Sequence, residues 1–274
     1  MRIHTGFEIT YDCPMPVPML LMLSVHPSRR GDLETADWLR TDPVVDVRQY
    51  VDAYGNTCSR VLAPAGRFVM SSDFIIRDSG LVDDYAPDAI QIAVHNLPDD
   101  ALVYLLGSRY CETDALSDLA WSLFGKTELG WPRVQAICDY VHDHIRFDYQ
   151  QARPTRSAHE AHAESVGVCR DYAHLAIAFC RCMNIPARYC TGYMGDIGVP
   201  EAGVMDFSAW FEAYLGGRWY TFDARNNTPR IGRVLIARGR DATDVPIANT
   251  FGQAYLADFK VITDELPVAA QPAA

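Results

Sequence analysis

One stretch of this chain, residues 171–183, is apolar on nearly every side of the helix that its spacing predicts. Tyr172, Ala176, Phe179 and Met183 form one row at helical spacing, and leucine, isoleucine, alanine and cysteine fill the other faces. A helix of this composition is buried and does not lie on a surface. The rest of the chain must therefore enclose it, and we expect it at the centre of the fold.

The start of this helix carries a reactive side chain. Cys169 follows Gly167 and Val168, which we expect to form the entry loop, and the helix should end near Asn184 because Pro186 follows. A thiol in the first turn of a helix lies near unpaired N–H groups and the positive end of the helix dipole, which favour thiolate. Cys169 is therefore a candidate nucleophile, although a cysteine can also be an ordinary small core residue.

A second segment, residues 206–223, has an aromatic-rich run on each side of Gly216–Gly217. A pair of glycines between two strand-forming runs is a strong signal for a β-hairpin. With the two glycines as the loop, Trp210 faces Asp223 across the hairpin. Ser208 then shares a face with Trp210 and is diagonal to Asp223, where a long side chain could reach the carboxylate and a serine could not.

Together these segments resemble the bacterial transglutaminase-like proteins, in the cysteine-protease branch of the transglutaminase and papain-like group. The resemblance covers nearly the whole chain, because the first ninety residues look like that family's β-rich N-terminal region. The stretches that carry it are Gly167–Leu175, Ile185–Tyr189, Gly192–Tyr193, Ala209–Tyr214 with Trp219 and Phe222–Asp223, and Arg230–Asp241.

The resemblance implies an α+β fold. An N-terminal β-sandwich-like domain would precede a transglutaminase/papain-like core, in which the cysteine-bearing helix packs on an antiparallel sheet. We expect the first domain over residues 1–80, a linker with three Asp and two Pro residues over 81–98, the core over 99–262 and a flexible tail over 263–274.

Hydrophobic patterning predicts individual elements within these regions. Alternation predicts strands in the first domain over 2–12, 20–25, 44–54, 58–63 and 67–76. In the core we expect helices over 116–124 and 131–145, and strands near 187–193, 207–215 and 218–224.

In the family, a cysteine at a helix start, a histidine on a strand and an aspartate on the next strand form a catalytic triad. The resemblance maps the cysteine onto Cys169, the aspartate onto Asp223 and the histidine onto Ser208. The implied chemistry is acyl transfer: the thiolate attacks an amide carbonyl of a peptide-like substrate, an amine leaves, and water or a second amine takes the acyl group. Loss of the histidine as general acid–base typically costs about 10²–10⁴-fold in rate.

Three interpretations of Ser208 follow. In the first, Ser208 is a natural substitution in an inactive pseudoenzyme that keeps the cleft for a peptide or protein partner. In the second, it is an engineered change that traps a complex. In the third, another residue serves as the base. The nearest histidines in sequence are His159, His162 and His174, and none follows His174. His174 lies about 140° around the helix from Cys169 and should point elsewhere, whereas His159 and His162 stay candidates.

Other side chains near these segments are candidates for substrate binding. Trp210 could line the cleft, although aromatic residues on a hairpin more often belong to the core. Arg170 and Tyr172 flank the nucleophile on the predicted helix. The run 225–240 contains five arginines, which could hold a carboxylate-bearing substrate or could be loop residues that need no ligand.

Composition narrows the partners and the location. The chain has 274 residues and a formal net charge of −11, which argues against nucleic acid and anionic membranes as partners. No apolar run approaches the ~20 residues of a membrane span, and the N-terminus shows no signal-peptide pattern, so we expect a cytoplasmic protein.

The eight cysteines include no Cys-x-x-Cys pair, which indicates reduced thiols. Cys180 and Cys182 lie about 200° apart on the predicted helix and cannot face one ion. His159 and His162 have workable spacing for a metal but no apparent third ligand. We therefore expect neither a metal nor another cofactor.

Overall fold

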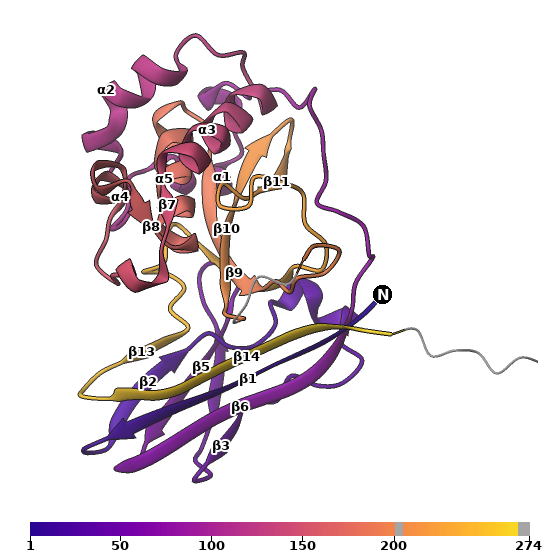
Figure 1. The fold of residues 1–274 in the computed structure, drawn as a ribbon, viewed down its shortest axis with the longest axis vertical. Helices are drawn as coiled ribbons and strands as arrows, with labels where there is room; N and C mark the ends of the chain where they lie inside the picture. The colour runs from indigo at the N-terminus through magenta and orange to yellow at the C-terminus, as the bar shows by residue number, and fades with distance from the viewer. Residues whose placement is uncertain (201–204, 268–274) are drawn as a thin grey trace, which may run out of the picture.

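A computed structural model of the chain describes residues 1–200 and 205–267. It has two parts, a β-rich part that contains the N-terminus and a part in which helices cover a central sheet (Figure 1). This arrangement confirms the predicted α+β fold class, with the cysteine-bearing helix packed on an antiparallel sheet.

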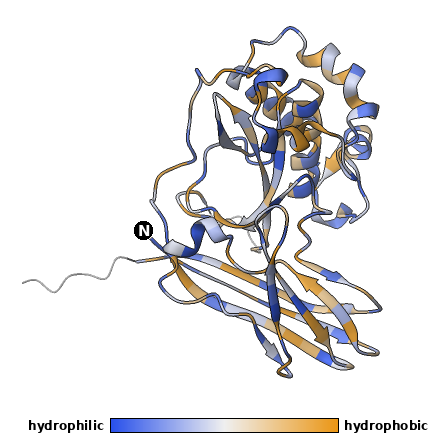
Figure 2. Ribbon diagram, turned by 180° about the vertical axis from the view of Figure 1, so that it is seen from behind, coloured by the Kyte–Doolittle hydropathy of each residue, from blue (hydrophilic) through white to orange (hydrophobic). Residues whose placement is uncertain are grey.

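Two four-stranded antiparallel sheets form the β-rich part, with strand orders β14-β1-β6-β3 and β13-β2-β5-β4. Hydrophobic and hydrophilic residues alternate along these strands (Figure 2), as expected where only one face of a sheet is buried. The strands are β1 (Arg2–Cys13), β2 (Val17–Leu21), β3 (Arg40–Asp42), β4 (Arg48–Val51), β5 (Thr57–Ala63), β6 (Gly66–Arg77), β13 (Ala248–Thr250) and β14 (Tyr255–Leu266).

Three of the five strands predicted here are confirmed within one or two residues: β1, β5 and β6. The predicted strand over 20–25 is displaced, because the paired segment β2 ends at Leu21 and the next residues leave the sheet. Of the predicted strand over 44–54, only Arg48–Val51 pairs, and its side chains are all exposed at a sheet edge.

The last two strands correct the predicted domain limits. β14 pairs with β1 from Arg2 opposite Leu266 to Asp12 opposite Tyr255, and β13 pairs with β2. Residues assigned to the end of the core and the start of the tail therefore complete the N-terminal sheets. β14 covers an edge of β1 that would otherwise expose unpaired backbone groups. The rest of the predicted tail, 268–274, lies outside the described residues.

The second part contains a sheet of order β11-β10-β9-β12 and the helices around it. Its strands are β7 (Arg146–Phe147), β8 (Val166–Gly167), β9 (Ala187–Tyr193), β10 (Ser208–Leu215), β11 (Arg218–Phe222) and β12 (Val234–Gly239), with β7 and β8 paired separately in parallel. Its α-helices are α1 (Asp99–Leu102), α2 (Thr113–Phe124), α3 (Trp131–His144), α4 (Ala158–Glu164) and α5 (Cys169–Cys182). The 3₁₀ helices of the chain are η1 (Pro27–Asp32), η2 (Val94–Asn96), η3 (Val103–Leu105) and η4 (Tyr149–Gln151).

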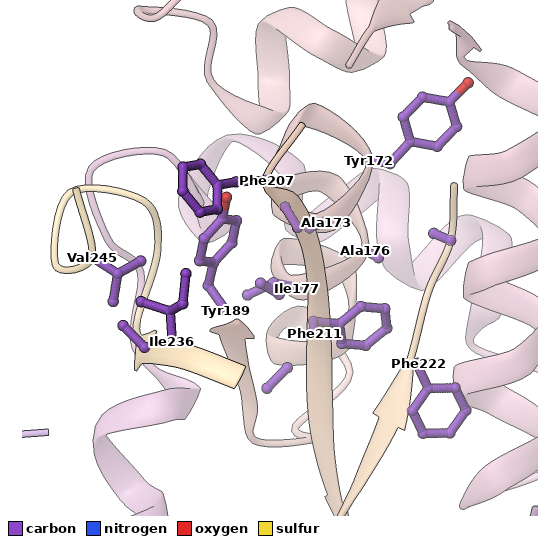
Figure 3. Close-up of a cluster of buried hydrophobic side chains, with 14 of the residues drawn as sticks. Tyr172, Ala173, Ala176, Ile177, Tyr189, Phe207, Phe211, Phe222, Ile236 and Val245 are labelled. Atoms are coloured by element: carbon purple, nitrogen blue, oxygen red, sulfur yellow. The ribbon is translucent and has the colours of Figure 1, made fainter. Parts of the chain in front are cut away.

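Helix α5 is the buried centre of this part, as its apolar faces predict. Every residue from Asp171 to Cys182 is buried, and the helix contacts α2, α3, α4, β9 and β10. Figure 3 shows Ala176 and Ile177 of α5 beside Phe211 of β10. The packing fixes the start of α5 against the same strand that carries Ser208.

The predicted hairpin has the predicted register. Phe211 of β10 pairs with Phe222 of β11, and their rings stack with centroids 5.7 Å apart. The two glycines of the loop, Gly216–Gly217, have φ angles of 56° and 92°, which other residues rarely adopt. Ser208 therefore begins β10, and Asp223 follows the last residue of β11.

Among the described residues, no helix is both long and apolar enough to cross a bilayer. All eight cysteines are free thiols. Across 1–200 and 205–267, no three His, Cys, Asp or Glu side chains are grouped so that they could hold a metal ion.

Candidate active site

The position of Cys169 is set by the residues around the start of α5. The backbone N–H of Val168 donates to Asp171 Oδ2 at 2.9 Å, and Arg156 Nη1 donates to the same oxygen at 3.1 Å. A Cβ atom on Gly167 would lie 2.6 Å from the Asp171 Cβ, so only glycine permits this approach. A buried carboxylate thus caps the helix and holds its first residue in place.

Cys169 opens onto a cleft of about 280 Å³, which we call the Cys169 cleft. Ser208 also lines it, so the structure brings together two of the three predicted triad positions. The other lining residues are Phe147, Tyr149, Met194, Asp196, Met205, Asp206, Phe207, Arg225, Asn226 and Arg230. They come from η4 and its neighbours, from the segment after β9, and from the segments before β10 and after β11.

The thiol of Cys169 is less acidic than the helix start predicts. Burial raises its pKa to about 11, and the negative charges of Asp206 and Asp223 act in the same direction. A hydrogen bond from the backbone N–H of Ala209 and the positive charge of Arg225 oppose this rise. The expectation of a thiolate in the free protein is therefore wrong, because desolvation outweighs these contributions and the helix end.

Ser208 contributes a buried hydroxyl to the cleft. Its residue is 7% exposed, and its Oγ has no hydrogen-bond partner in the described part of the chain. The backbone of Ser208 is fixed by its pairing with Gly192 of β9. As predicted, the serine does not reach the Asp223 carboxylate.

Asp223 is bound by other residues. Its Oδ2 accepts from Arg233 Nη2 at 2.9 Å and from Asn226 Nδ2 at 2.8 Å, and its Oδ1 accepts from the Asn226 backbone at 3.0 Å. Burial acts to raise the pKa of Asp223, but Arg233 and Asn226 together bring it below its ordinary value. The carboxylate is therefore ionised, and it anchors Arg233 and the turn after β11.

The three histidines considered as replacement bases lie outside the cleft. His162 hydrogen-bonds to the Tyr140 hydroxyl at 2.9 Å, and His159 is an exposed residue of α4. His174 is buried, its Nε2 accepts the Ala242 N–H at 3.1 Å, and burial lowers its pKa to about 3. In the described residues no histidine lines the Cys169 cleft, so this interpretation of Ser208 loses its candidates.

The three predicted substrate-binding residues do not line this cleft either. Trp210 is buried, with the Arg233 guanidinium 5.0 Å from its ring centre. Arg170 donates to a backbone carbonyl and to Asp171, and the hydroxyl of buried Tyr172 donates to a backbone carbonyl. On α5, Arg170 is rotated by about 100° from Cys169. Tyr172 lies three residues on, nearer the face of Cys169, but its hydroxyl donates to the carbonyl of Ile145 and does not reach the cleft.

The five-arginine run is mostly internal. Arg230, Arg233, Arg238 and Arg240 bond to carboxylates or backbone carbonyls, and part of the run forms β12. Only Arg225 forms no ion pair with a described residue, and its guanidinium lies 4.2 Å from the centre of the Phe147 ring. Among the described residues, it is the member of the run whose guanidinium reaches the cleft without an ion-pair partner.

Sequence reasoning missed Asp206. The side chain lines the Cys169 cleft and is partly buried, and burial raises its pKa. Its Oδ1 accepts the N–H of Phe207 at 2.6 Å. The signal was its spacing, because Asp206 stands two residues before Ser208 and would share its face in a continued strand.

Comparison with known proteins assigns the segment that contains the cleft to a family. Residues 120–224, which include Cys169, Ser208 and Asp223, match the model of the Transglutaminase-like superfamily. An uncharacterised protein of Mycobacterium leprae is 33% identical over 103 residues, which are 36% of this chain and 37% of that protein. The match thus spans little more than a third of that relative.

Among solved structures, a protein from Cytophaga hutchinsonii described as a "putative cysteine protease" is similar over almost its whole length. It has a TM-score of 0.85 and 32% identity, with 99% of this chain and 93% of that chain covered. The periplasmic domain of TgpA from Pseudomonas aeruginosa is more distant, with a TM-score of 0.41, 15% identity, and 80% and 75% of the two chains covered. The chain belongs to the transglutaminase-like superfamily.

Proposed function

We propose that this protein transfers acyl groups from peptide-like amides or esters through a Cys169 thioester, with a weakened step of amine departure. The cysteine attacks the carbonyl carbon, and the first N–H groups of α5 hold the oxyanion. Water or an amine then takes the acyl group. The protein acts as a hydrolase in the first case and as an acyltransferase in the second.

One observation carries this proposal: Cys169 stands at the first residue of a buried helix and opens onto a cleft that Ser208 shares. A cysteine that served only to fill the core would not need this opening. The cleft offers surfaces for a peptide that carries a negative charge: the aromatic rings of Phe147 and Tyr149, and Arg225, which forms no ion pair with the residues that the structure describes.

A second candidate is a non-catalytic protein that binds a peptide or protein partner in the same cleft. The observation that favours it is the combination of a thiol with a pKa of about 11 and a serine at the histidine position. At neutral pH such a thiol is almost fully protonated and is a weak nucleophile. A cytoplasmic location likewise stays a prediction.

The leaving group separates the two candidates. An amide nitrogen must be protonated before it leaves, whereas a nitrophenolate leaves unprotonated, so an enzyme without its histidine should still react with an aryl ester. We expect an N-acetyl dipeptide nitrophenyl ester to add one acyl group to Cys169, seen by intact mass spectrometry after an acid quench. Product analysis with and without a primary amine then distinguishes transfer from hydrolysis.

The control is Cys169→Ala, which should form no adduct. This change removes one sulfur atom from a cleft wall, and we expect it to alter the free energy of unfolding by less than about 1 kcal/mol. Ser208→His is the matched gain-of-function variant and should speed the reaction of amides more than that of the ester. If neither the native protein nor Ser208→His forms an adduct, the enzyme proposal is wrong and the binding candidate replaces it.

A further inference from the structure

We infer that Asp206 is the proton-transfer residue of the Cys169 cleft: it takes the thiol proton during attack and returns it to the leaving amine. The inference rests on the acyl-transfer function proposed above. It assigns to a carboxyl group the step that a histidine performs in the family.

Position is the first argument. Asp206 precedes β10 by two residues, and its side chain lines the same cleft as Cys169 and Ser208. Its charge acts on the Cys169 thiol, and the charges of both residues act on the Tyr149 phenol, which lines the cleft as well. The carboxyl group and the sulfur thus belong to one cluster of side chains.

Freedom from ion pairs is the second argument. The neighbouring cleft carboxylate Asp196 lies 3.4 Å from Arg230, and buried Asp223 lies 2.9 Å from Arg233. Asp206 forms no ion pair with any described residue, and its one hydrogen bond comes from the backbone of Phe207. A carboxylate held by an arginine keeps its charge, whereas an unpaired one can gain and lose a proton.

The electrostatic setting of Asp206 favours that exchange. Burial raises its pKa towards neutrality, with the Phe207 N–H acting against the rise. The titratable and charged side chains that share the cleft with it are Tyr149, Cys169, Asp196, Arg225 and Arg230. A proton-transfer group works best when its pKa lies near the working pH, so a raised carboxyl pKa moves Asp206 in the useful direction.

The proposed steps balance. As the Cys169 sulfur attacks the amide carbon, its proton moves to the Asp206 carboxylate and a tetrahedral oxyanion forms. The C–N bond then breaks while Asp206 returns the proton to the nitrogen, which leaves as an amine and a thioester remains. Water attacks the thioester, Asp206 takes a proton from it, and Cys169 leaves as the thiol after that proton is returned.

The test exploits two opposite effects of Asp206→Asn. Removing the negative charge should lower the Cys169 pKa, so alkylation by iodoacetamide near pH 8 should become faster. Amide turnover should nevertheless fall by about 10²–10⁴-fold, because the general acid–base is lost. Turnover of the nitrophenyl ester should fall much less, since its leaving group needs no proton.

Matched variants separate proton transfer from charge alone. Asp196→Asn removes a carboxylate from the same cleft, and it should retain the acidic limb of the pH–rate profile that Asp206→Asn loses. Asp206→Glu keeps the titrating group and should recover part of the amide turnover. Ser208→His added to Asp206→Asn should also restore amide turnover, because an imidazole can carry the proton instead.

The outcomes are distinguishable. If Asp206→Asn speeds both alkylation and amide turnover, or leaves amide turnover unchanged, Asp206 acts only through its charge and the inference is overturned while the enzyme proposal stands. If no variant, including Ser208→His, forms a Cys169 adduct with the ester, the enzyme proposal fails and this inference fails with it. An unchanged midpoint of urea unfolding is the check that Asp206→Asn is folded, because unfolding would also expose the thiol and speed its alkylation.

Discussion

The Cys169 cleft and the side chains around Trp210 use charged residues in different ways. In the second region, which we call the arginine network, Glu212 lies 2.5 Å from Arg188 and 3.0 Å from Arg238. Arg233 in the same network lies 2.9 Å from Asp223 and 3.0 Å from Asp83. In the cleft, Asp206 and Arg225 form no ion pairs with described residues.

The difference appears in the direction of the pKa shifts. Burial acts to raise the pKa of Glu212 and of Asp223, but their arginines bring both below the ordinary value. The pKa of Asp206 and of Cys169 is raised, because the effect of burial there outweighs the hydrogen bonds and the charge that oppose it. Paired carboxylates are fixed charges that support the fold, and the unpaired carboxyl group is the one that can change protonation during a reaction.

Breaking a pair in the arginine network should have the largest effect on stability. Asp223→Ala leaves Arg233 buried, with Asp83 as its remaining carboxylate partner among the described residues. Breaking a buried pair costs about 3–5 kcal/mol. The free energy of unfolding, from urea titration, should fall towards the lower end of that range, because Asp83 remains. Asp206→Ala is the matched control and should cost less than about 1 kcal/mol. Equal losses of unfolding free energy in Asp223→Ala and Asp206→Ala would contradict the proposed difference between the arginine network and the cleft.

A methyl group at the entry to α5 should have the next largest effect. In Gly167→Ala the new Cβ would lie 2.6 Å from the Asp171 Cβ, and such overpacking typically costs about 1–3 kcal/mol. Because Asp171 caps the helix, the start of α5 and the Cys169 sulfur should also shift. Gly31→Ala is a suitable control, since its Cβ would have no described atom within 4 Å. A normal melting temperature and alkylation rate in Gly167→Ala would show that the cap is not needed to place the thiol.

The two kinds of carboxylate should make opposite contributions to acid stability. Glu212 and Asp223 have lowered pKa values in the folded protein, so their contribution is present above about pH 4 and is lost as the pH falls through the folded pKa. The folded pKa of Asp206 is raised, so its contribution declines as the pH rises from about 4 to that folded value. Urea unfolding from pH 3 to 7 should show a flatter acid side in Glu212→Gln and a smaller decline with pH in Asp206→Asn. If Glu212→Gln and Asp206→Asn changed the slope of unfolding free energy against pH in the same direction, the distinction between paired and unpaired carboxylates would be wrong.

The central helix and the hairpin were predictable because each depends on local sequence. The apolar faces of α5 and the glycine pair at 216–217 specify burial and register without knowledge of distant residues. α4 had a readable signal as well, since Ser157 and Glu160 form the reciprocal hydrogen bonds of a capping box. β14 was missed because its place depends on β1, about 250 residues earlier, and alternation does not identify a partner.

The chemistry of the site was less predictable than the helix and strands that carry it. The position of Cys169 at a helix start is a local property, but its pKa depends on burial by segments from four parts of the chain. The same limit applies to Trp210, which the hairpin places on the predicted face but which the fold buries beneath Arg233. Asp206 became a candidate only when the fold brought it to the cleft, and Arg225 was distinguished from the rest of the predicted arginine run only because it forms no ion pair with a described residue.

The smallest expected effect is a change in the pKa of Cys169 when the positive charge of Arg225 is removed. Arg225→Gln removes the cation that lowers the Cys169 pKa, so alkylation at a fixed pH should slow. The change should be a few-fold, because a charge pair that solvent reaches is worth on the order of 0.5–1 kcal/mol. Asp206→Asn should shift the alkylation profile in the opposite direction, and the double variant should lie near the native protein if the two charges act independently. A profile that Arg225→Gln leaves unchanged would show that the guanidinium on Phe147 does not act on the sulfur, and Arg225 would then be only a surface for substrate.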